Sequence, residues 1–395
     1  MNKLLDRNSN TAILLAGVIA VIIGLGVARF AFTSLLPPML DGFLTVSFAG
    51  LLAAYNYVGY LTGSIFSMFI KNVHQKVFFF RIGMILCIVT TTILGVTENE
   101  TIWFISRILA GFGSAMVFVV GSAIIMKRLK FESKTKAMGI HFSGIGFSIL
   151  VTDLLGRAVL SNGGAWSNAW IVLAIFAALG ASYSVYILNA NKPKDTTVAT
   201  HKFDFSLFNF FAILIIIAYF TVGIGFVVQA TFLPDIINSI EGLEGYGSLT
   251  WTLVGLAGIP SCIIWMNLAD KYGSVNIIII TMSLLVLSIL IPTFTSNMYL
   301  NLLSGVLYGG TFIALVALFM NLGGKLAGAN PVILMGAVTT AYGIGQVIGP
   351  LYSVYFIENF GNYDYALYLT AFIVFAGILL LIFSKTIMNE KQKDL

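Results

Sequence analysis

Long apolar stretches, separated by short polar connections, run from one end of the sequence to the other. A hydrocarbon core about 30 Å thick needs roughly 20 apolar helical residues to cross it, so stretches of that length are candidate transmembrane helices. They number twelve, at residues 12–36, 47–70, 77–96, 101–127, 136–160, 167–189, 207–233, 245–268, 275–294, 298–320, 331–357 and 363–385. Helices are predicted rather than barrel strands, because barrel strands alternate apolar and polar residues in segments of about ten.

The charges along the chain predict which connections lie in the cytoplasm. The termini and the even-numbered connections hold 18 of the 21 Lys and Arg residues, whereas the odd-numbered connections hold acidic residues and no Lys or Arg. Cytoplasmic loops of membrane proteins carry the excess of Lys and Arg. We therefore expect a multi-pass protein of the cell inner membrane with both termini in the cytoplasm. The first apolar stretch is too long for a signal peptide and is expected to remain as helix 1.

Composition excludes a soluble enzyme or a nucleic-acid-binding domain. Hydrophobic residues make up 58% of the chain and charged residues only 9%, against roughly 25% charged residues in soluble domains. The net charge of +5 follows from the cytoplasmic loops rather than from a basic binding face. Cys87 and Cys262 lie in different predicted helices with no His or acid at ligand spacing, so no metal, cofactor or disulfide is expected.

The chain divides into two similar halves around a polar stretch at 190–206, which is predicted to be a cytoplasmic linker. Residues 1–189 and 207–395 would each form a bundle of six helices. Three features recur in the same order: Gly24 and Gly26 match Gly223 and Gly225, Arg107 and Gly111 match Asn301 and Gly305, and Gly144 and Gly146 match Gly343 and Gly345. The predicted fold is an all-α membrane protein with twelve transmembrane helices in two six-helix pseudo-repeat bundles.

Several motifs resemble those of the major facilitator superfamily (MFS) of transporters. NLADKYG at 267–273 is similar to the family's loop signature, and Arg107, Gly111 and Gly113 match its helix-4 motif. GLGVARFAFTSLLPPM, HFSGIG and GQVIGP resemble more narrowly the YbfB/YjiJ-like bacterial branch. The resemblance implies secondary active transport by alternating access, and it implies a cytoplasmic gating contact for Asp270, Lys271 and Gly273. The first half departs from the pattern, because Lys71 stands where the loop signature has Asp.

Charges at membrane depth are candidates for substrate binding and proton coupling, because they are costly there and usually face a bundle interior. Arg29, Arg107 and Arg157 remain once the cytoplasmic cations are set aside, and Asp153 is the acid within a predicted span. We expect Arg29 and Arg107 to bind an anionic substrate group and Asp153 to pair with one of them as a protonatable switch. The alternative is a structural charge network, with Arg157 reaching toward the interface.

Neutral polar residues supply the other candidates. In the first half, Asn56 and Tyr60 are expected to bind substrate, and His141 to relay protons. The second half offers no membrane-depth charge, so its substrate-binding candidates are Gln229, Asn301, Tyr308, Tyr342 and Gln346. The alternative for each is a hydrogen bond between helices.

The sequence predicts a secondary active transporter for a small organic solute, with an organic anion as the preferred substrate and proton coupling as the energy source. The alternative is a proton-driven exporter of drugs or amphipathic metabolites. An intramembrane enzyme or a membrane sensor is disfavoured, because no span carries a nucleophile and base pair, an HExxH motif or paired carboxylates. The expected partners are the solute, the bilayer and H⁺ or another ion, with no nucleic acid, and we expect a monomer.

Overall fold

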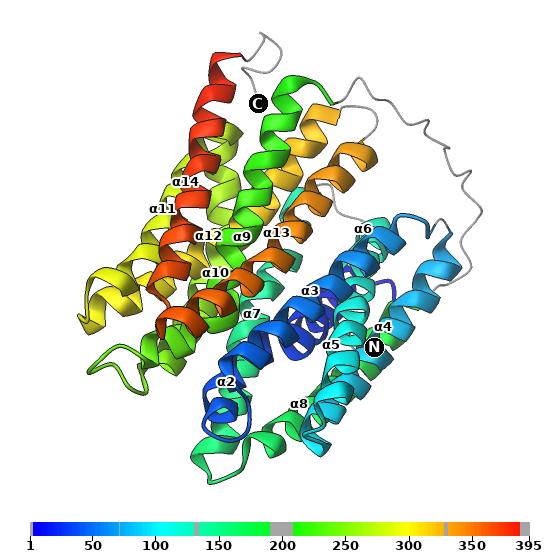
Figure 1. The fold of residues 1–395 in the computed structure, drawn as a ribbon. Coiled ribbons are helices and arrows are strands. Elements are labelled where there is room, and N and C mark those ends of the chain that lie inside the picture. The colour runs from blue at the N-terminus through cyan, green and yellow to red at the C-terminus, as the bar shows by residue number, and fades with distance from the viewer. Residues whose placement is uncertain (1–2, 71, 130–133, 190–207, 328–330, 388–395) are drawn as a thin grey trace. The chain divides into compact units, whose positions relative to one another are not determined.

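The computed structural model describes residues 3–70, 72–129, 134–189, 208–327 and 331–387, and helices form all of the regular structure in these ranges (Figure 1). The linker predicted at 190–206 lies outside the described residues. Each predicted span overlaps one helix or one continuous run of helical segments. This agreement follows from the apolar stretches, because a long run without polar interruption satisfies its backbone groups best as a helix.

In the first half, two of the helical runs contain a π-helical segment. The first run consists of α1 (Asn10–Val21), η1 (Ile22–Phe30) and α2 (Ala31–Leu40), and another consists of α5 (Glu100–Ala115), η2 (Met116–Val120) and α6 (Gly121–Arg128). The remaining helices are α3 (Val46–Ser67), α4 (Val73–Val96), α7 (Lys134–Ser161) and α8 (Trp166–Ile187).

In the described residues of the second half, all of the helices are α-helices. They are α9 (Phe210–Asn238), α10 (Tyr246–Tyr272), α11 (Ser274–Phe294), α12 (Met298–Ala327), α13 (Pro331–Phe360) and α14 (Asp364–Thr386).

Among the described residues, ten helical segments are long and apolar enough to cross a membrane. Helices α3 and α13 occupy the other two predicted spans and are not among the ten. Both contain several Gly, Tyr and polar residues. The structure therefore supports a multi-pass membrane protein, and spanning by α3 and α13 stays a prediction.

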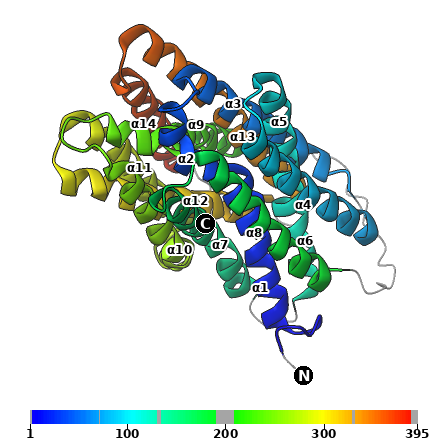
Figure 2. The ribbon, with the colours of Figure 1, turned by 90° about the horizontal axis from the view of Figure 1, so that it is seen from below.

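The chain forms two compact units. Unit 1 comprises residues 1–45 and 55–199, and unit 2 comprises residues 46–54 and 200–395. Within unit 1, α4 packs against α5 and α8, and α1 packs against α7 (Figure 2). Within unit 2, α9 packs against α13 and α14, and α12 packs against α10 and α11.

Glycine allows helices to approach closely in both units. A Cβ atom added to Gly111 of α5 would lie 2.0 Å from the Asn56 carbonyl oxygen of α3. In unit 2, a Cβ atom on Gly309 of α12 would lie 2.1 Å from the Val254 carbonyl oxygen of α10. Backbones in contact at this distance leave no room for any side chain, as is common where membrane helices associate through small residues.

Candidate functional site

Arg29 lies inside the π-helical segment η1 and is only 7% exposed. Segments with i→i+5 hydrogen bonds are rare, and they occur often at functional sites. The matching helix in the second half, α9, is α-helical from end to end. The sequence contained no signal for η1, because a π-helix depends on how neighbouring helices pack and not on a residue pattern.

Aromatic rings of α3 surround the Arg29 guanidinium. Its Cζ atom lies 4.2 Å from the centroid of the Tyr57 ring and 5.1 Å from that of Tyr60, with Phe30 at 5.7 Å. These distances fall within the range of cation–π interactions, which stabilise a desolvated cation by up to about 2 kcal/mol. The structure thus brings Arg29 and Tyr60 together as candidates. Tyr57 and Phe30 were missed, although the i, i+3 spacing of Tyr57 and Tyr60 puts both rings on one side of α3.

Arg107 and Asn56 meet at the backbone of η1. The Arg107 side chain donates from Nη1 to the Ala28 carbonyl oxygen at 3.1 Å, and Asn56 donates from Nδ2 to the same oxygen at 3.5 Å. Asn56 Nδ2 also donates to the Arg107 carbonyl oxygen at 3.1 Å. Both side chains are at most 2% exposed. These contacts join α3 and α5 to the carbonyl group that precedes Arg29, which favours a role in holding η1 in place.

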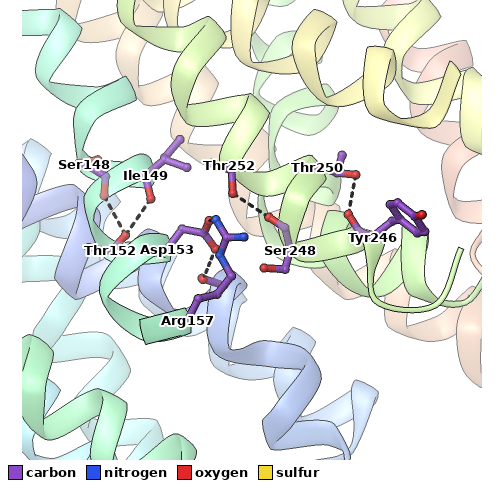
Figure 3. Close-up of polar contacts among 10 residues, drawn as sticks. Ser148, Ile149, Thr152, Asp153, Arg157, Tyr246, Ser248, Thr250 and Thr252 are labelled. Atoms are coloured by element: carbon purple, nitrogen blue, oxygen red, sulfur yellow. Dashed lines mark hydrogen bonds and ion pairs between the residues drawn. The ribbon is translucent and has the colours of Figure 1, made fainter. Parts of the chain in front are cut away.

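Asp153 of α7 is fully buried and forms an ion pair with Arg157, one helical turn further on (Figure 3). The Asp153 Oδ2 and Arg157 Nη2 atoms are 2.9 Å apart, and Ser34 of α2 donates from Oγ to Asp153 Oδ1 at 2.7 Å. The Arg157 side chain is 35% exposed. The sequence led us to expect Arg29 or Arg107 as a partner of Asp153, and that pairing stays a prediction. The structure shows an ion pair of Asp153 with Arg157. An i, i+4 spacing makes this pair local and easy to form.

Helix α7 also contacts η1 directly. A Cβ atom added to Gly26 of η1 would lie 2.9 Å from the Ser148 carbonyl oxygen and 3.1 Å from Cγ2 of Thr152, the residue before Asp153. The segment that carries Arg29 and the turn that carries Asp153 therefore pack against each other within unit 1.

His141 is 1% exposed and lies beside the second π-helical segment. Its Nε2 atom lies 2.8 Å from Ser122 Oγ, and Ser122 Oγ donates to the Phe118 carbonyl oxygen of η2. Whether His141 Nε2 or Ser122 Oγ donates in this contact depends on the tautomer of the imidazole ring. Nδ1 is buried and has no hydrogen-bond partner among the described residues.

Three of the second-half candidates make hydrogen bonds to neighbouring helices or caps. Gln229 of α9 donates from Nε2 to the Ser288 carbonyl oxygen of α11 and accepts from Ser288 Oγ, both at 3.1 Å. Asn301 donates from Nδ2 to the Thr295 carbonyl oxygen at 2.8 Å. Tyr308 of α12 donates from its hydroxyl to the Phe226 carbonyl oxygen of α9 at 2.8 Å. These contacts favour roles in helix packing.

Tyr342 and Gln346 lie one helical turn apart on α13. Tyr342 stacks on Tyr219 of α9, with ring centroids 4.5 Å apart and planes inclined by 14°. Gln346 is 1% exposed, and its Oε1 atom has no hydrogen-bond partner among the described residues. Buried polar atoms without partners are uncommon in proteins and call for an explanation.

The predicted gating residues lie where α10 ends. Asp270 and Lys271 are exposed, and Lys271 Nζ lies 5.0 Å from the centroid of the Tyr272 ring. Gly273 separates α10 from α11 with φ 88° and ψ 139°, a conformation that is essentially restricted to glycine. The motif thus makes a sharp junction between two helices, and its gating role stays a prediction.

Unit 2 also contains a cavity of about 350 Å³ at the C-terminal ends of α9 and α11 and the start of α14. Side-chain hydroxyls line part of it, including those of Ser239, Thr295 and Tyr363. The Tyr363 hydroxyl donates to Asp235, and burial together with this carboxylate raises the pKa of Tyr363 well above its usual value. None of the residues predicted from the sequence lines this cavity.

Comparisons with known proteins agree with this architecture. Residues 21–382 match the protein family described as "Uncharacterised MFS-type transporter YbfB". The crystal structure of a mutant of the nucleoside transporter NupG superposes with a TM-score of 0.74 at 13% sequence identity, covering 94% of this chain and 99% of that one. At that identity the likeness concerns the fold alone.

A curated relative matches over a shorter region. The multidrug efflux pump SdrM of Staphylococcus aureus (strain N315) is 27% identical over 125 residues, which are 31% of this chain and 27% of the pump. The chain thus spans about a quarter of the length of that relative. Because the family match covers nearly the whole chain, the chain belongs to the YbfB family of MFS-type membrane transporters.

Proposed function

We propose that this protein is a proton-coupled secondary transporter that moves a small organic anion across the cell inner membrane by alternating access. The observation that carries the proposal is Arg29, a buried cation in a π-helical segment, held by Tyr57 and Tyr60 beside α7. Neither an open channel nor a purely structural helix needs a cation in such a segment.

The proposal includes the arrangement in the membrane. All twelve predicted spans, α3 and α13 among them, cross the bilayer, and residues 1–189 and 207–395 form two six-helix bundles. Both termini lie in the cytoplasm, because the Lys and Arg residues concentrate there. The protein works as a monomer.

Arg29 would bind the anionic group of the solute. A guanidinium group forms bidentate hydrogen bonds with a carboxylate, and such charged hydrogen bonds contribute about 1.5–3 kcal/mol each. Stacking on Tyr57 and Tyr60 fixes the plane of the guanidinium and so reduces the entropy lost when the anion binds. Arg107 and Asn56 would assist by holding the Ala28 carbonyl group.

Asp153 would couple proton movement to the solute. The ionised carboxylate holds Arg157 and accepts from Ser34 of α2. Protonation removes the ion pair, which frees Arg157 and loosens the contact between α7 and α2. Because α7 packs on η1, that change would reach the segment that carries Arg29. His141 is a second proton-coupling candidate, because its buried Nδ1 has no hydrogen-bond partner among the described residues.

A second candidate function is proton-driven export of drugs or amphipathic metabolites. The match to the efflux pump SdrM supports it, although it covers only 27% of the pump. An exporter of lipophilic cations would gain nothing from Arg29, which repels them.

Transport in proteoliposomes under an imposed pH gradient tests the proposal. We expect the protein to accumulate an organic anion, and we expect Arg29→Ala and Asp153→Asn each to abolish accumulation while the variants insert and purify as folded monomers. Arg157→Lys, which retains the charge beside Asp153, should keep part of the activity. Normal transport by Arg29→Ala or Asp153→Asn removes that residue from the mechanism, and stabilisation of the purified protein by lipophilic cations alone favours the exporter.

A further inference from the structure

Unit 2 contains a cluster of six aromatic rings where α9, α12 and α13 meet. The members of this aromatic cluster are Tyr219, Phe226, Tyr308, Phe312, Phe319 and Tyr342. Three of them form a continuous stack, because Tyr219 lies between Phe319, at 4.4 Å and 19°, and Tyr342, at 4.5 Å and 14°. Such near-parallel faces are suited to another flat ring.

The fold does not require aromatic residues at these positions. In the register that aligns Gly24 with Gly223, Gly111 with Gly305 and Gly144 with Gly343, six residues of the first half correspond to the cluster. They are Ala20, Val27, Ser114, Phe118, Ile125 and Ser143, of which one is aromatic. Helix packing at this place is therefore possible with small and aliphatic side chains, and the rings of unit 2 call for another explanation.

One end of the stack is the most exposed ring of the cluster and lies next to a buried hydrogen-bond acceptor without a partner among the described residues. Tyr342 is 8% exposed, whereas the other five rings are at most 3% exposed. One helical turn beyond it on α13, Gln346 Oε1 is buried and has no hydrogen-bond partner among the described residues. Leaving such an acceptor unsatisfied costs about 1–3 kcal/mol, so a ligand that supplies a donor there gains that free energy on binding.

We propose that the solute carries a planar aromatic ring, which stacks at the Tyr342 end of the aromatic cluster, with an N–H or O–H donor on the ring edge bonded to Gln346 Oε1. This inference rests on the proposed transport function and specifies the substrate class of unit 2.

Matched ligand pairs test the ring and the donor separately, with binding to the purified full-length protein measured by calorimetry and thermal shift. Benzoate against cyclohexanecarboxylate, and benzamide against cyclohexanecarboxamide, differ in the ring. 4-Hydroxybenzoate against 4-methoxybenzoate differs in the donor. We expect the aromatic member to bind at least about threefold more tightly, and the hydroxyl to add about a further tenfold.

Three variants locate the effect. Tyr342→Leu should remove the preference for the aromatic member, whereas Tyr342→Phe, which keeps the ring, should retain it. Gln346→Met should abolish the discrimination between 4-hydroxybenzoate and 4-methoxybenzoate while leaving the ring preference intact. If Tyr342→Leu does not fold, Tyr342→Phe and Gln346→Met still decide the outcome. Comparing these two variants shows whether the donor of the ligand bonds to Gln346.

The inference is overturned if aromatic and saturated members bind equally, if no aromatic member binds, or if Gln346→Met leaves the discrimination unchanged. Its failure is distinguishable from failure of the proposed function. If a non-aromatic anion is taken up, and this uptake depends on Arg29 and the pH gradient, the proposed function is supported and the aromatic site is not. Ring-selective binding without any gradient-driven transport would support the aromatic site and contradict the proposed function.

Discussion

Unit 1 and unit 2 hold their buried polar groups in different ways. Unit 1 contains buried charged side chains, and the helical runs that carry Arg29 and Arg107 both include a π-helical segment. Unit 2 has uninterrupted α-helices in the matching places, uncharged candidates, and the aromatic cluster. Unit 1 thus combines buried charged side chains with irregular helical backbone, whereas unit 2 combines uncharged polar side chains and stacked rings with regular helices.

The π-helical segments belong to this difference. A wider helical turn leaves backbone carbonyl groups that need other donors, and in unit 1 Arg107 and Asn56 donate to Ala28. In unit 2, Asn301 stands at the place that matches Arg107 and bonds to a helix cap, and Gln229 of α9 bonds to the neighbouring helix α11. Unit 1 thus uses these polar side chains to support an irregular backbone, and unit 2 uses them to join regular helices.

The largest effect on stability is expected at a feature that the two units share. Gly309→Ala would place a Cβ atom 2.1 Å from the Val254 backbone oxygen, and backbone cannot move aside as a flexible side chain does. We expect a loss of about 3 kcal/mol in the free energy of unfolding. The neighbouring Gly310 is the control, because a Cβ atom there meets nothing within 4 Å. Unfolding in detergent measures both, and equal stabilities of the two variants would contradict close helix contact at Gly309.

A smaller effect is expected from making unit 1 resemble unit 2 at its helix-4 motif. Arg107→Asn introduces the residue that stands at the matching place, Asn301, and removes the bond to Ala28. We expect a loss of about 1.5–3 kcal/mol in stability, together with weaker binding of an anionic solute because η1 loses support beside Arg29. Ser106→Ala on the same helix removes a bond to the Thr90 carbonyl oxygen and should leave affinity unchanged. Unaltered affinity in Arg107→Asn would show that unit 1 does not need this support.

The smallest effect concerns the junctions that follow α3 and α10. In unit 1, Asn72 caps α4 by accepting from the Gln75 backbone N–H at 2.7 Å, whereas α11 of unit 2 begins at Gly273 without a side-chain cap. Asn72→Ala should therefore cost about 1 kcal/mol in the free energy of unfolding. Gln75→Ala, which removes an exposed side chain and leaves the cap bond in place, should change stability by less than about 0.5 kcal/mol. Identical unfolding curves for both variants would argue against the cap.

The sequence by itself determined where the helices lie and to which class of protein they belong. Apolar length and the positions of Lys and Arg are local properties, so the predicted spans overlap the observed helices, and the motifs around Arg107, Gly144 and Asp270 identified the family. It also selected Arg29, Tyr60, Tyr342 and Gln346, because a polar residue in an apolar run is conspicuous without any structure.

Only the tertiary structure decided what those side chains contact. The bond from Ser34 to Asp153, the bonds from Arg107 and Asn56 to Ala28, and the stack of Tyr219 and Tyr342 all depend on how each helix is rotated toward its neighbours. The π-helical segments arise in the same way, from contacts between residues far apart in the chain. Helix rotation is set by the sum of many packing contacts, and no single stretch of sequence encodes that sum.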